Sequence, residues 1–266
     1  MPRIAIPLTI ELPEPEVIDV TSLARGLSDG SIDLVTVLGP TASGKTKYAV
    51  RLAKQLQDAT GVECEIISAD SRQVFRGMDI GTGKDLCEYD GVAYHLIDIL
   101  PAGAKYNVYD YQRDFAQAWK EIRERGHHPI LCGGTGLYIQ AVTTAYDFGF
   151  DKPRVPAELL PQHTFYIGTL VSREERVRRI DARLDARLEE GMVEEIRGLI
   201  DGGVKPEDLI WYGLEYKFVT QYVTGEISYE KMRGDLAIAI HQFAKRQMTW
   251  FRGMERHGIY IHWTEV

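Results

Sequence analysis

Short runs of apolar residues alternate along the chain with longer segments in which apolar residues recur every three or four positions. The short runs have the length and β-branched content of buried strands, and the periodic segments have the spacing of amphipathic helices. The runs predict strands at 34–38, 65–68, 94–99, 129–132, 164–170 and 258–263. The periodic segments predict helices at 45–57, 108–125, 172–190, 192–200 and 228–252. Strands that alternate with helices are typical of a parallel sheet flanked by helices, so we predict an α/β fold.

The same pattern divides the chain into parts. The predicted parts are an extension without an assigned role at 1–32, an α/β core at 33–171, a helical C-terminal region packing on the core at 172–257, and a possible final core strand at 258–266. Within the extension, apolar pieces could form an edge strand at 4–12 and one helical turn at 20–27. A proline-bearing stretch at 147–162 is too short for a domain and is interpreted as a connector.

Composition narrows the class of protein. With 266 residues, 44% of them apolar, the chain can bury one large core or one core with a helical annex. Its three cysteines have irregular spacing that gives neither a metal pattern nor an even disulfide count, so we predict a reducing, cytoplasmic environment. No apolar run approaches the roughly 20 residues of a membrane span, so we expect no membrane contact, and we expect a monomer.

Charge bears on nucleic-acid binding. The formal net charge of -8 argues against non-specific binding of nucleic acid by the whole surface. Any such contact would have to come from local basic clusters, of which the arginine-bearing segment 172–190 and the segment 245–256 are the clearest. Taken alone, the segment 172–190 is interpreted as a solvent-exposed helix with ion pairs between residues four apart. If it lies beside a phosphate-binding loop, one or two of its arginines could bind an anion.

The segment GPTASGKT at 39–46 fits the phosphate-loop pattern G-x-x-x-x-G-K-[ST] and lies between a predicted strand and a predicted helix. The glycines let successive backbone N–H groups point at one anion, and the following helix adds its positive N-terminal end. Lys45 supplies a mobile charge and Thr46 a hydroxyl for Mg²⁺. The residues predicted to contact a diphosphate are Gly39, Thr41, Ala42, Ser43, Gly44, Lys45 and Thr46.

A carboxylate follows the second predicted strand. Asp70 comes just past the apolar run 65–68, at the edge where open parallel sheets bind ligands. After a phosphate loop, such an aspartate is more often a Mg²⁺ partner than a base. The residues alone therefore indicate a Mg²⁺-assisted transfer that involves a di- or triphosphate, and do not name the reaction.

Seven motifs occur in one order along the chain. They are GPTASGKT (39–46), ADSRQVF (69–75), DIGTGK (79–84), YHLID (94–98), GGTGLY (133–138), SREERVRRIDARLDARLEEGMVEE (172–195) and AKRQMTWFRG (244–253). Together they resemble the tRNA dimethylallyltransferase family, also called tRNA isopentenyltransferases, over most of 34–253. The resemblance implies a P-loop NTPase-like, nucleotide-kinase-like core that grips the diphosphate of dimethylallyl diphosphate instead of using ATP.

In that family, the five-carbon unit goes to N6 of the adenine at position 37 of the tRNA anticodon loop, and diphosphate leaves. Charge develops on the departing diphosphate, where the loop, Lys45 and Mg²⁺ are aimed. The adenine amino group is a poor nucleophile, and the resemblance implies that Asp70 orients it and accepts its proton. It also places Thr82 near the reacting centre. The predicted catalytic residues are thus Asp70, Thr82 and Lys45.

The resemblance further implies a set of contacts to the adenine or the tRNA. These residues are Ser71, Arg72, Gln73, Gly133, Gly134, Thr135, Gly136, Arg183, Lys245, Arg246 and Gln247. Residues 133–136 are expected to form the wall that faces the adenine. Trp250 and Phe251 could add stacking on bases, or could simply be core.

Three departures from the family pattern stand out. Where the family usually has I-G-T-A-K-P, this chain has IGTGKD at 80–85. The family usually has an arginine shortly before G-Y-[KR]-[EQ], whereas the segment LIWYGLEY at 209–216 has none. Most bacterial members also insert a helical domain that grips the anticodon stem between the positions of Tyr138 and Arg173, where this chain has only the connector.

These departures leave the acceptor open. Transfer to tRNA is favoured because the spellings of 70–73 and 244–250 resemble the tRNA-modifying branch. The alternative is an adenylate isopentenyltransferase that acts on free AMP, ADP or ATP. A P-loop kinase and an idle nucleotide- or RNA-binding module are disfavoured, the latter because Lys45, Thr46, Asp70 and Thr82 are all intact.

Overall fold

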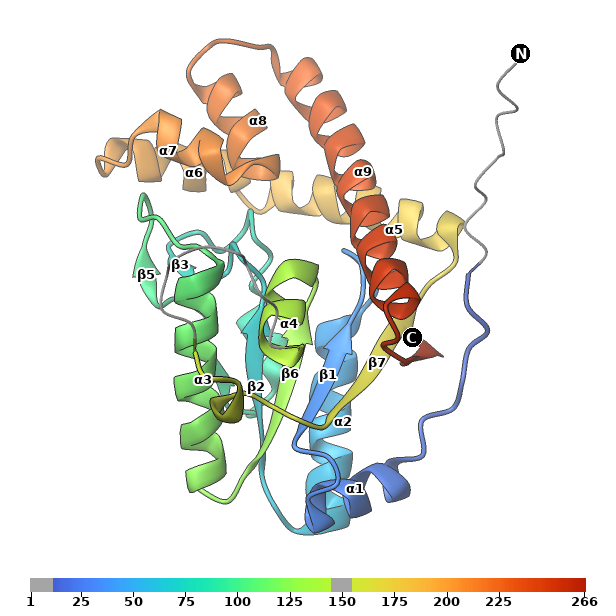
Figure 1. Ribbon diagram of the computed structural model, residues 1–266. Coiled ribbons are helices and arrows are strands. Elements are labelled where there is room, and N and C mark those ends of the chain that lie inside the picture. The colour runs from blue at the N-terminus through green and yellow to red at the C-terminus, as the bar shows by residue number, and fades with distance from the viewer. Residues whose placement is uncertain (1–11, 145–154) are drawn as a thin grey trace, which may run out of the picture.

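A parallel six-stranded sheet lies at the centre of the computed structural model, which describes residues 12–144 and 155–266. Its strand order is β4-β2-β6-β1-β7-β8. The strands are β1 (Leu34–Leu38), β2 (Cys64–Ala69), β4 (Tyr94–His95), β6 (His128–Gly133), β7 (Thr164–Leu170) and β8 (Ile261–Glu265). Every strand pair in it is parallel, so the carboxyl ends of all six strands meet at one edge (Figure 1). Two shorter strands, β3 (Phe75–Arg76) and β5 (Leu100–Pro101), pair separately.

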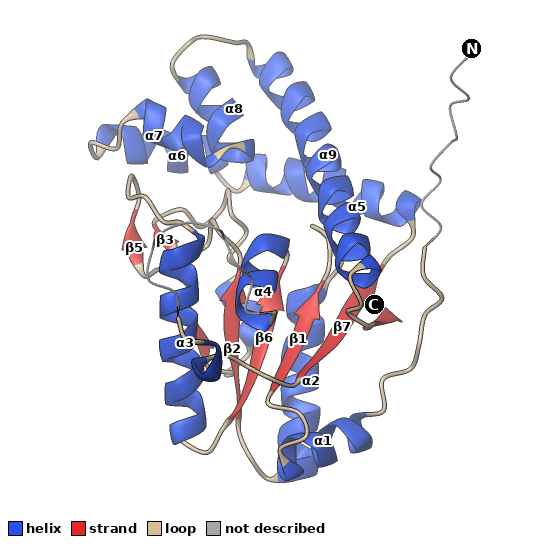
Figure 2. Cartoon of the chain, viewed as in Figure 1, coloured by secondary structure: helices blue, strands red, loops and turns tan. Residues whose placement is uncertain are grey.

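Helices cover both faces of this sheet (Figure 2). They are α1 (Val20–Asp29) and α2 (Lys45–Thr60) on one face, and α3 (Val108–Glu124) and α4 (Gly136–Thr143) on the other. Because successive side chains of a strand point to opposite faces, Val35 and Val37 join the α1–α2 cluster, whereas Leu34 and Leu38 join the α3–α4 cluster. Full burial on both faces explains why β1 is apolar or β-branched at every position.

Five further helices lie over the carboxyl edge of the sheet (Figure 1). They are α5 (Arg173–Glu189), α6 (Met192–Asp201), α7 (Pro206–Tyr212), α8 (Leu214–Val223) and α9 (Tyr229–Arg256). Their apolar faces continue the α3–α4 core through fully buried residues such as Tyr216, Leu236 and Phe251. The helical region therefore roofs the edge at which the phosphate loop and Asp70 emerge.

The predicted α/β fold is confirmed, with local differences. The predicted strand at 94–99 is wrong beyond His95, because Leu96 and Asp98 have φ of 61° and 57° and turn the backbone away from the sheet. The final strand is present but begins at Ile261 instead of residue 258. Helices α4, α7 and α8 were not predicted, since glycine-rich or aromatic sequence hid their short periodic patterns.

The N-terminal part is longer and better packed than the sequence indicated. Helix α1 has ten residues instead of one turn, and its N-cap Asp19 accepts from two backbone N–H groups. Leu23 and Leu27 pack in the α2 cluster, and the N–H of Glu16 donates to the Trp263 carbonyl at 2.6 Å. The predicted edge strand lies outside the described residues except for Leu12, which is not in a strand.

Of the predicted connector, the described part is 155–162, which holds a 3-10 turn at Ala157–Leu159. Across the two described ranges, no helix has the length and apolar content needed to cross a membrane.

Candidate active site

The loop between β1 and α2 has the backbone shape that the phosphate-loop motif requires. Ala42 and Gly44 take left-handed φ of 64° and 79°, which turns the chain sharply before α2 begins. A Cβ atom at Gly39 would lie 2.1 Å from Thr169 Oγ1, so only glycine fits there. The Ser43 hydroxyl is fully buried and shares a 2.6 Å hydrogen bond with Thr169 Oγ1. The Ser43 side chain thus fixes the loop to β7. Its contact with a diphosphate stays a prediction.

Gln247 of α9 holds the same loop from its other side. Its Oε1 accepts from the Thr41 N–H at 2.8 Å, and its Nε2 donates to the Gly134 carbonyl at 2.9 Å. Gln247 was predicted to contact substrate or tRNA. The structure instead uses its amide to join the phosphate loop to the turn after β6.

The glycine-rich turn after β6 faces protein more than cavity. Gly133 lines the cavity, and a Cβ there would lie 2.3 Å from the Ala69 carbonyl oxygen. A Cβ at Gly134 would meet Gln247, and one at Gly136 would meet the Trp250 indole at 2.3 Å. Of the predicted wall of 133–136, only Gly133 lines the cavity, and its contact with adenine stays a prediction. The other two glycines let α9 approach closely.

A cavity lies between the sheet edge and the helical region. Its polar lining near the sheet edge comes from Thr41, Lys45, Thr46, Ser68, Asp70, Gln73, Thr82 and Cys132. Its apolar lining comes from Ile80, Ile180, Leu184, Met192 and Ile240, the last four on α5, α6 and α9. The helical residues of the apolar part were not singled out in the sequence analysis. The cavity thus joins a phosphate-binding loop to an apolar pocket.

Lys45 is a cation without a counterion in the described parts of the chain, where no hydrogen bond or ion pair involves its ammonium group. Burial lowers its pKa; Cys132 and Asp70 oppose this shift, and the charges of Arg183 and Arg72 add to it. A buried, unpaired ammonium group is costly unless an anion joins it. Its surroundings therefore favour binding of an anionic ligand.

Asp70 follows β2 as predicted and lines the cavity. Its Oδ1 accepts from the Arg72 N–H at 3.0 Å, and its own N–H donates to Ser68 Oγ at 3.3 Å. Within 12–144 and 155–266, its Oδ2 has no hydrogen-bond partner. That oxygen is available to accept a proton or to bind a metal ion, so the geometry is compatible with either role.

The neighbours of Asp70 hold this loop in place. The Ser71 N–H donates to Thr135 Oγ1 at 3.1 Å, which explains the position of Thr135 outside the cavity lining. Arg72 forms an ion pair with Glu215 of α8, and both side chains are 14% exposed. Burial alone would lower the pKa of Arg72, but Glu215 and Asp70 raise it, so the guanidinium stays charged. Glu215 had no recognisable sequence signal.

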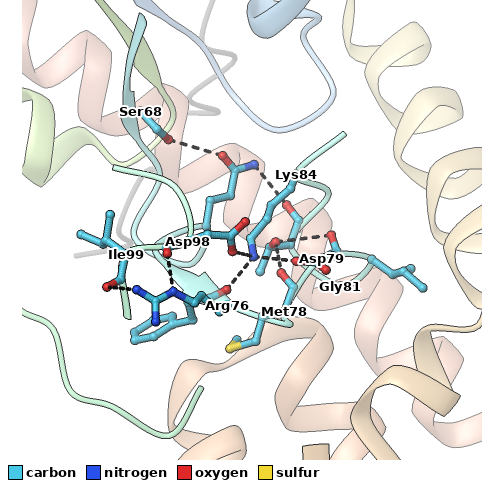
Figure 3. Close-up of polar contacts among 12 residues, drawn as sticks. Ser68, Arg76, Met78, Asp79, Gly81, Lys84, Asp98 and Ile99 are labelled. Atoms are coloured by element: carbon cyan, nitrogen blue, oxygen red, sulfur yellow. Dashed lines mark hydrogen bonds and ion pairs between the residues drawn. The ribbon is translucent and has the colours of Figure 1, made fainter. Parts of the chain in front are cut away.

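Thr82 lies between Gly81 and Lys84 in a loop held by buried polar contacts, of which Figure 3 shows those of Lys84 with Asp79 and Asp98. The Lys84 ammonium group is 2% exposed; it donates to the Phe75 carbonyl at 2.6 Å and pairs with Asp79 and Asp98. Gln73 Nε2 donates to the Gly83 carbonyl at 3.2 Å. The Thr82 hydroxyl donates to the Met78 carbonyl, so its oxygen can only accept from a ligand. Its catalytic role stays a prediction.

Glu195 of α6 is a residue that sequence reasoning missed. Its carboxylate accepts from the N–H groups of Asp79, Ile80 and Gly81 at 2.8, 2.6 and 3.1 Å, and from the Tyr216 hydroxyl at 2.7 Å. One carboxylate from the helical region therefore binds the turn that precedes Thr82. It lay among 39 acidic residues without a distinguishing pattern.

Glu195→Ala is expected to destabilise the protein by about 2 kcal/mol or more, since it leaves several backbone donors without their charged acceptor. Transfer should slow as well, because the Thr82 loop loses its anchor. Urea unfolding measures the first effect. The matched control is Glu194→Ala, whose side chain is exposed and makes only a 3.9 Å ion pair with Arg197. Equal midpoints for the two variants would refute the anchoring role.

The predicted basic contacts on α9 lie outside the cavity lining. Lys245 and Arg246 are exposed, and their contact with tRNA stays a prediction. Phe251 is fully buried, so the stacking alternative is wrong for it. Trp250 is 41% exposed and packs against Gly136.

Comparison with known proteins decides the family. The sequence model of the IPP transferase family matches residues 73–161 and 150–254, which together make up more than half of the 266 residues. The chain belongs to the IPP transferase family. The resemblance drawn from the seven motifs is thereby confirmed.

Named members of the IPP transferase family and solved structures agree. The chain is 46% identical to tRNA dimethylallyltransferase 1 of Parabacteroides distasonis, covering 89% of this chain and 93% of that protein. The full-length tRNA isopentenylpyrophosphate transferase of Bacillus halodurans has a TM-score of 0.76 and 31% identity, covering 88% and 89% of the two chains. The corresponding Staphylococcus epidermidis enzyme has a TM-score of 0.74 and 29% identity, covering 87% and 92%. These likenesses confirm the predicted P-loop NTPase-like fold.

The comparison also bears on the missing insertion. The alignment with the Parabacteroides protein runs over 293 positions, more than the 266 residues of this chain. That member of the IPP transferase family therefore has residues without a counterpart here. The two matched segments of the family model meet at 150–161, within the interval where the insertion was predicted to be absent.

Proposed function

We propose that this protein transfers the dimethylallyl group of dimethylallyl diphosphate to N6 of adenine 37 in the tRNA anticodon loop and releases diphosphate. One observation carries the proposal: the cavity joins the phosphate loop and the unpaired Lys45 to an apolar pocket formed by α5, α6 and α9. A charged head and a short apolar tail are the two parts of an allylic diphosphate. The names of the relatives, which include tRNA dimethylallyltransferase, support the same reaction.

The site residues account for each part of the transfer. The bond between C1 of the dimethylallyl group and the diphosphate oxygen breaks, and its electron pair leaves with the diphosphate. The phosphate-loop N–H groups and Lys45 stabilise that charge. The adenine N6 forms the new bond to C1, and the free Oδ2 of Asp70 accepts the proton that N6 loses.

The residues fit a magnesium ion that is held mainly by its substrate. Over the described ranges, no group of three or more His, Cys, Asp or Glu side chains could hold a metal. Mg²⁺ commonly keeps several waters and takes one or two protein ligands beside substrate phosphates. Thr46, at the start of α2, would supply such a ligand through its hydroxyl. When bound, Mg²⁺ neutralises charge on the diphosphate.

Transfer assays with two acceptors test the proposal. An anticodon stem-loop should be prenylated, and AMP should not. The cavity alone is expected to bind adenine weakly, whereas an RNA also makes contacts outside the cavity that offset the free energy of unstacking its adenine. Raising salt from 50 to 200 mM should lower the transfer efficiency about ten-fold or more if a few phosphates are contacted. A stem-loop with guanine at position 37 is the control. Efficient prenylation of AMP without product on the stem-loop would establish the free-nucleotide alternative. The cytoplasmic location and the monomeric state stay predictions.

A further inference from the structure

We propose that the Tyr89 hydroxyl donates a hydrogen bond to the bound diphosphate at the phosphate-loop side of the cavity. The proposal rests on the proposed function and adds a substrate contact to it. Neither the phosphate-loop pattern nor the seven family motifs include Tyr89, which lies between DIGTGK (79–84) and YHLID (94–98). The structure brings Tyr89 to the cavity from a short 3-10 helix, η1 (Leu86–Tyr89).

The Tyr89 side chain is buried, yet its hydroxyl group is unsatisfied. Only 4% of the residue is exposed, and its ring belongs to the apolar cluster of α1 and α2. In the described parts of the chain the hydroxyl makes no hydrogen bond, although its oxygen is not sealed from open space. Because Tyr89 lines the cavity, that open space is the cavity. The hydroxyl of a buried tyrosine usually finds a partner, so a ligand is expected to supply one here.

An ion pair places Tyr89 beside the start of α2. Its neighbour Glu88 pairs with Lys47 at 3.3 Å. Lys47 directly follows Thr46 in the first turn of α2, which begins at the end of the phosphate loop. The chain segment that carries Tyr89 therefore lies alongside the part of α2 to which the diphosphate is proposed to bind.

The groups around the Tyr89 hydroxyl place it at the same side of the cavity. Burial raises the pKa of Tyr89, and Cys132 and Asp70 raise it further, so both lie within electrostatic range of the hydroxyl. Thr46 is within hydrogen-bonding reach of Cys132. All four residues line the cavity. The hydroxyl thus stays protonated at neutral pH, as a hydrogen-bond donor must.

A neutral donor suits this part of the cavity. Lys45 and Arg183, the latter a predicted tRNA contact, bring two positive charges to it, and Arg183 helps to lower the pKa of Lys45. A phenol adds a donor without adding repulsion between cations. As the allylic C–O bond breaks, negative charge grows on the diphosphate, and a hydrogen bond to a charged oxygen is stronger than one between neutral groups. The contact should therefore favour the transition state over the ground state.

Tyr89→Phe removes the hydroxyl and keeps the ring. The variant should lower kcat about ten-fold or more, as expected for a lost hydrogen bond to a charged group, and should weaken binding of inorganic pyrophosphate in the presence of Mg²⁺. The midpoint of urea unfolding without ligand should stay unchanged, because the hydroxyl has no protein partner to lose within the described ranges. Transfer kinetics and calorimetric titration with pyrophosphate measure the two main effects. Native kinetics together with native pyrophosphate affinity would overturn the proposal.

Tyr94→Phe is the matched control. The Tyr94 ring packs against that of Tyr89, with centroids 4.7 Å apart, but Tyr94 is 39% exposed and lies outside the cavity lining. The substitution removes the same atom from the other member of the same aromatic pair. It should leave transfer and pyrophosphate affinity unchanged. Equal losses in the two variants would assign the effect to packing of the pair and refute a contact between Tyr89 and the ligand.

Pyrophosphate also separates the contact from other outcomes. It contains no adenine, so a Tyr89→Phe variant that loses affinity for the stem-loop but binds pyrophosphate normally would place the hydroxyl at the acceptor and contradict the proposal. If the native chain prenylates the stem-loop and Tyr89→Phe does so equally well, the contact is excluded while the function stands. If the native chain transfers nothing, the proposed function fails, and the pyrophosphate affinities of the native chain and Tyr89→Phe still decide whether the hydroxyl contacts the anion.

Discussion

Asp70→Asn is expected to slow prenyl transfer by about 10²- to 10⁴-fold, the range that a general base contributes. Asparagine keeps the shape of the side chain, and its oxygen can still accept the Arg72 N–H that Oδ1 accepts now. It cannot take the proton of the adenine amino group. Affinity for dimethylallyl diphosphate should therefore stay nearly unchanged. Single-turnover transfer to the stem-loop, with calorimetric binding of the diphosphate, measures both quantities.

The same variant separates the two roles that the free Oδ2 allows. Loss of diphosphate binding in the presence of Mg²⁺ would identify Asp70 as a metal partner and place the base elsewhere. Asp58→Asn, on the exposed face of α2, is the control for a carboxylate-to-amide change that should affect neither quantity.

The positions of Lys45 and Asp70 follow from local sequence and from the topology of a parallel sheet, whereas their roles stay predictions. Asp70 comes directly after β2, and the phosphate loop that leads to Lys45 follows β1. Parallel strands bring their carboxyl ends to one edge, so topology places the two side chains at the same edge of the sheet. The phosphate-loop motif works for the same reason: its glycines, its lysine and the start of α2 are contiguous.

The rest depends on contacts between distant segments. Gln247 matched a family motif, but its bonds to Thr41 and Gly134 could not be read from its neighbours in sequence. Glu195 binds a turn more than a hundred residues earlier in the chain. The left-handed backbone of Leu96 ended a strand whose composition predicted continuation, because no glycine marked the turn.

Gly83 shows how a departure from a family pattern becomes informative once contacts are known. In the sequence, glycine for alanine was a mild change. In the structure, it is the surface on which the Arg183 guanidinium lies.

Lys45→Ala is expected to lower transfer about 10²-fold or more, because one charged donor at a developing anion is worth roughly 3 kcal/mol. The lysine has no protein counterion in the described ranges, so its charge serves the ligand alone. The thermal stabilisation that pyrophosphate and Mg²⁺ give to the native chain should therefore shrink strongly in the variant. Transfer kinetics and a thermal shift series with pyrophosphate measure the two effects.

Lys47→Ala is the matched control, since its side chain is 73% exposed two residues further along the same helix and pairs only with Glu88 at 3.3 Å. Screening by solvent should keep its effect on transfer small. The stability of the unliganded protein should change less than its affinity for the ligand. Burial lowers the pKa of Lys45, which means that the fold disfavours its charge, so removing that charge should destabilise the fold less than it weakens the ligand complex. A Lys45→Ala variant that folds and transfers at a near-native rate would refute the phosphate-loop assignment. Within 12–144 and 155–266, Lys45 and Arg183 are the cations that line the cavity without an ion pair, so loss of Lys45 removes one of two free positive charges.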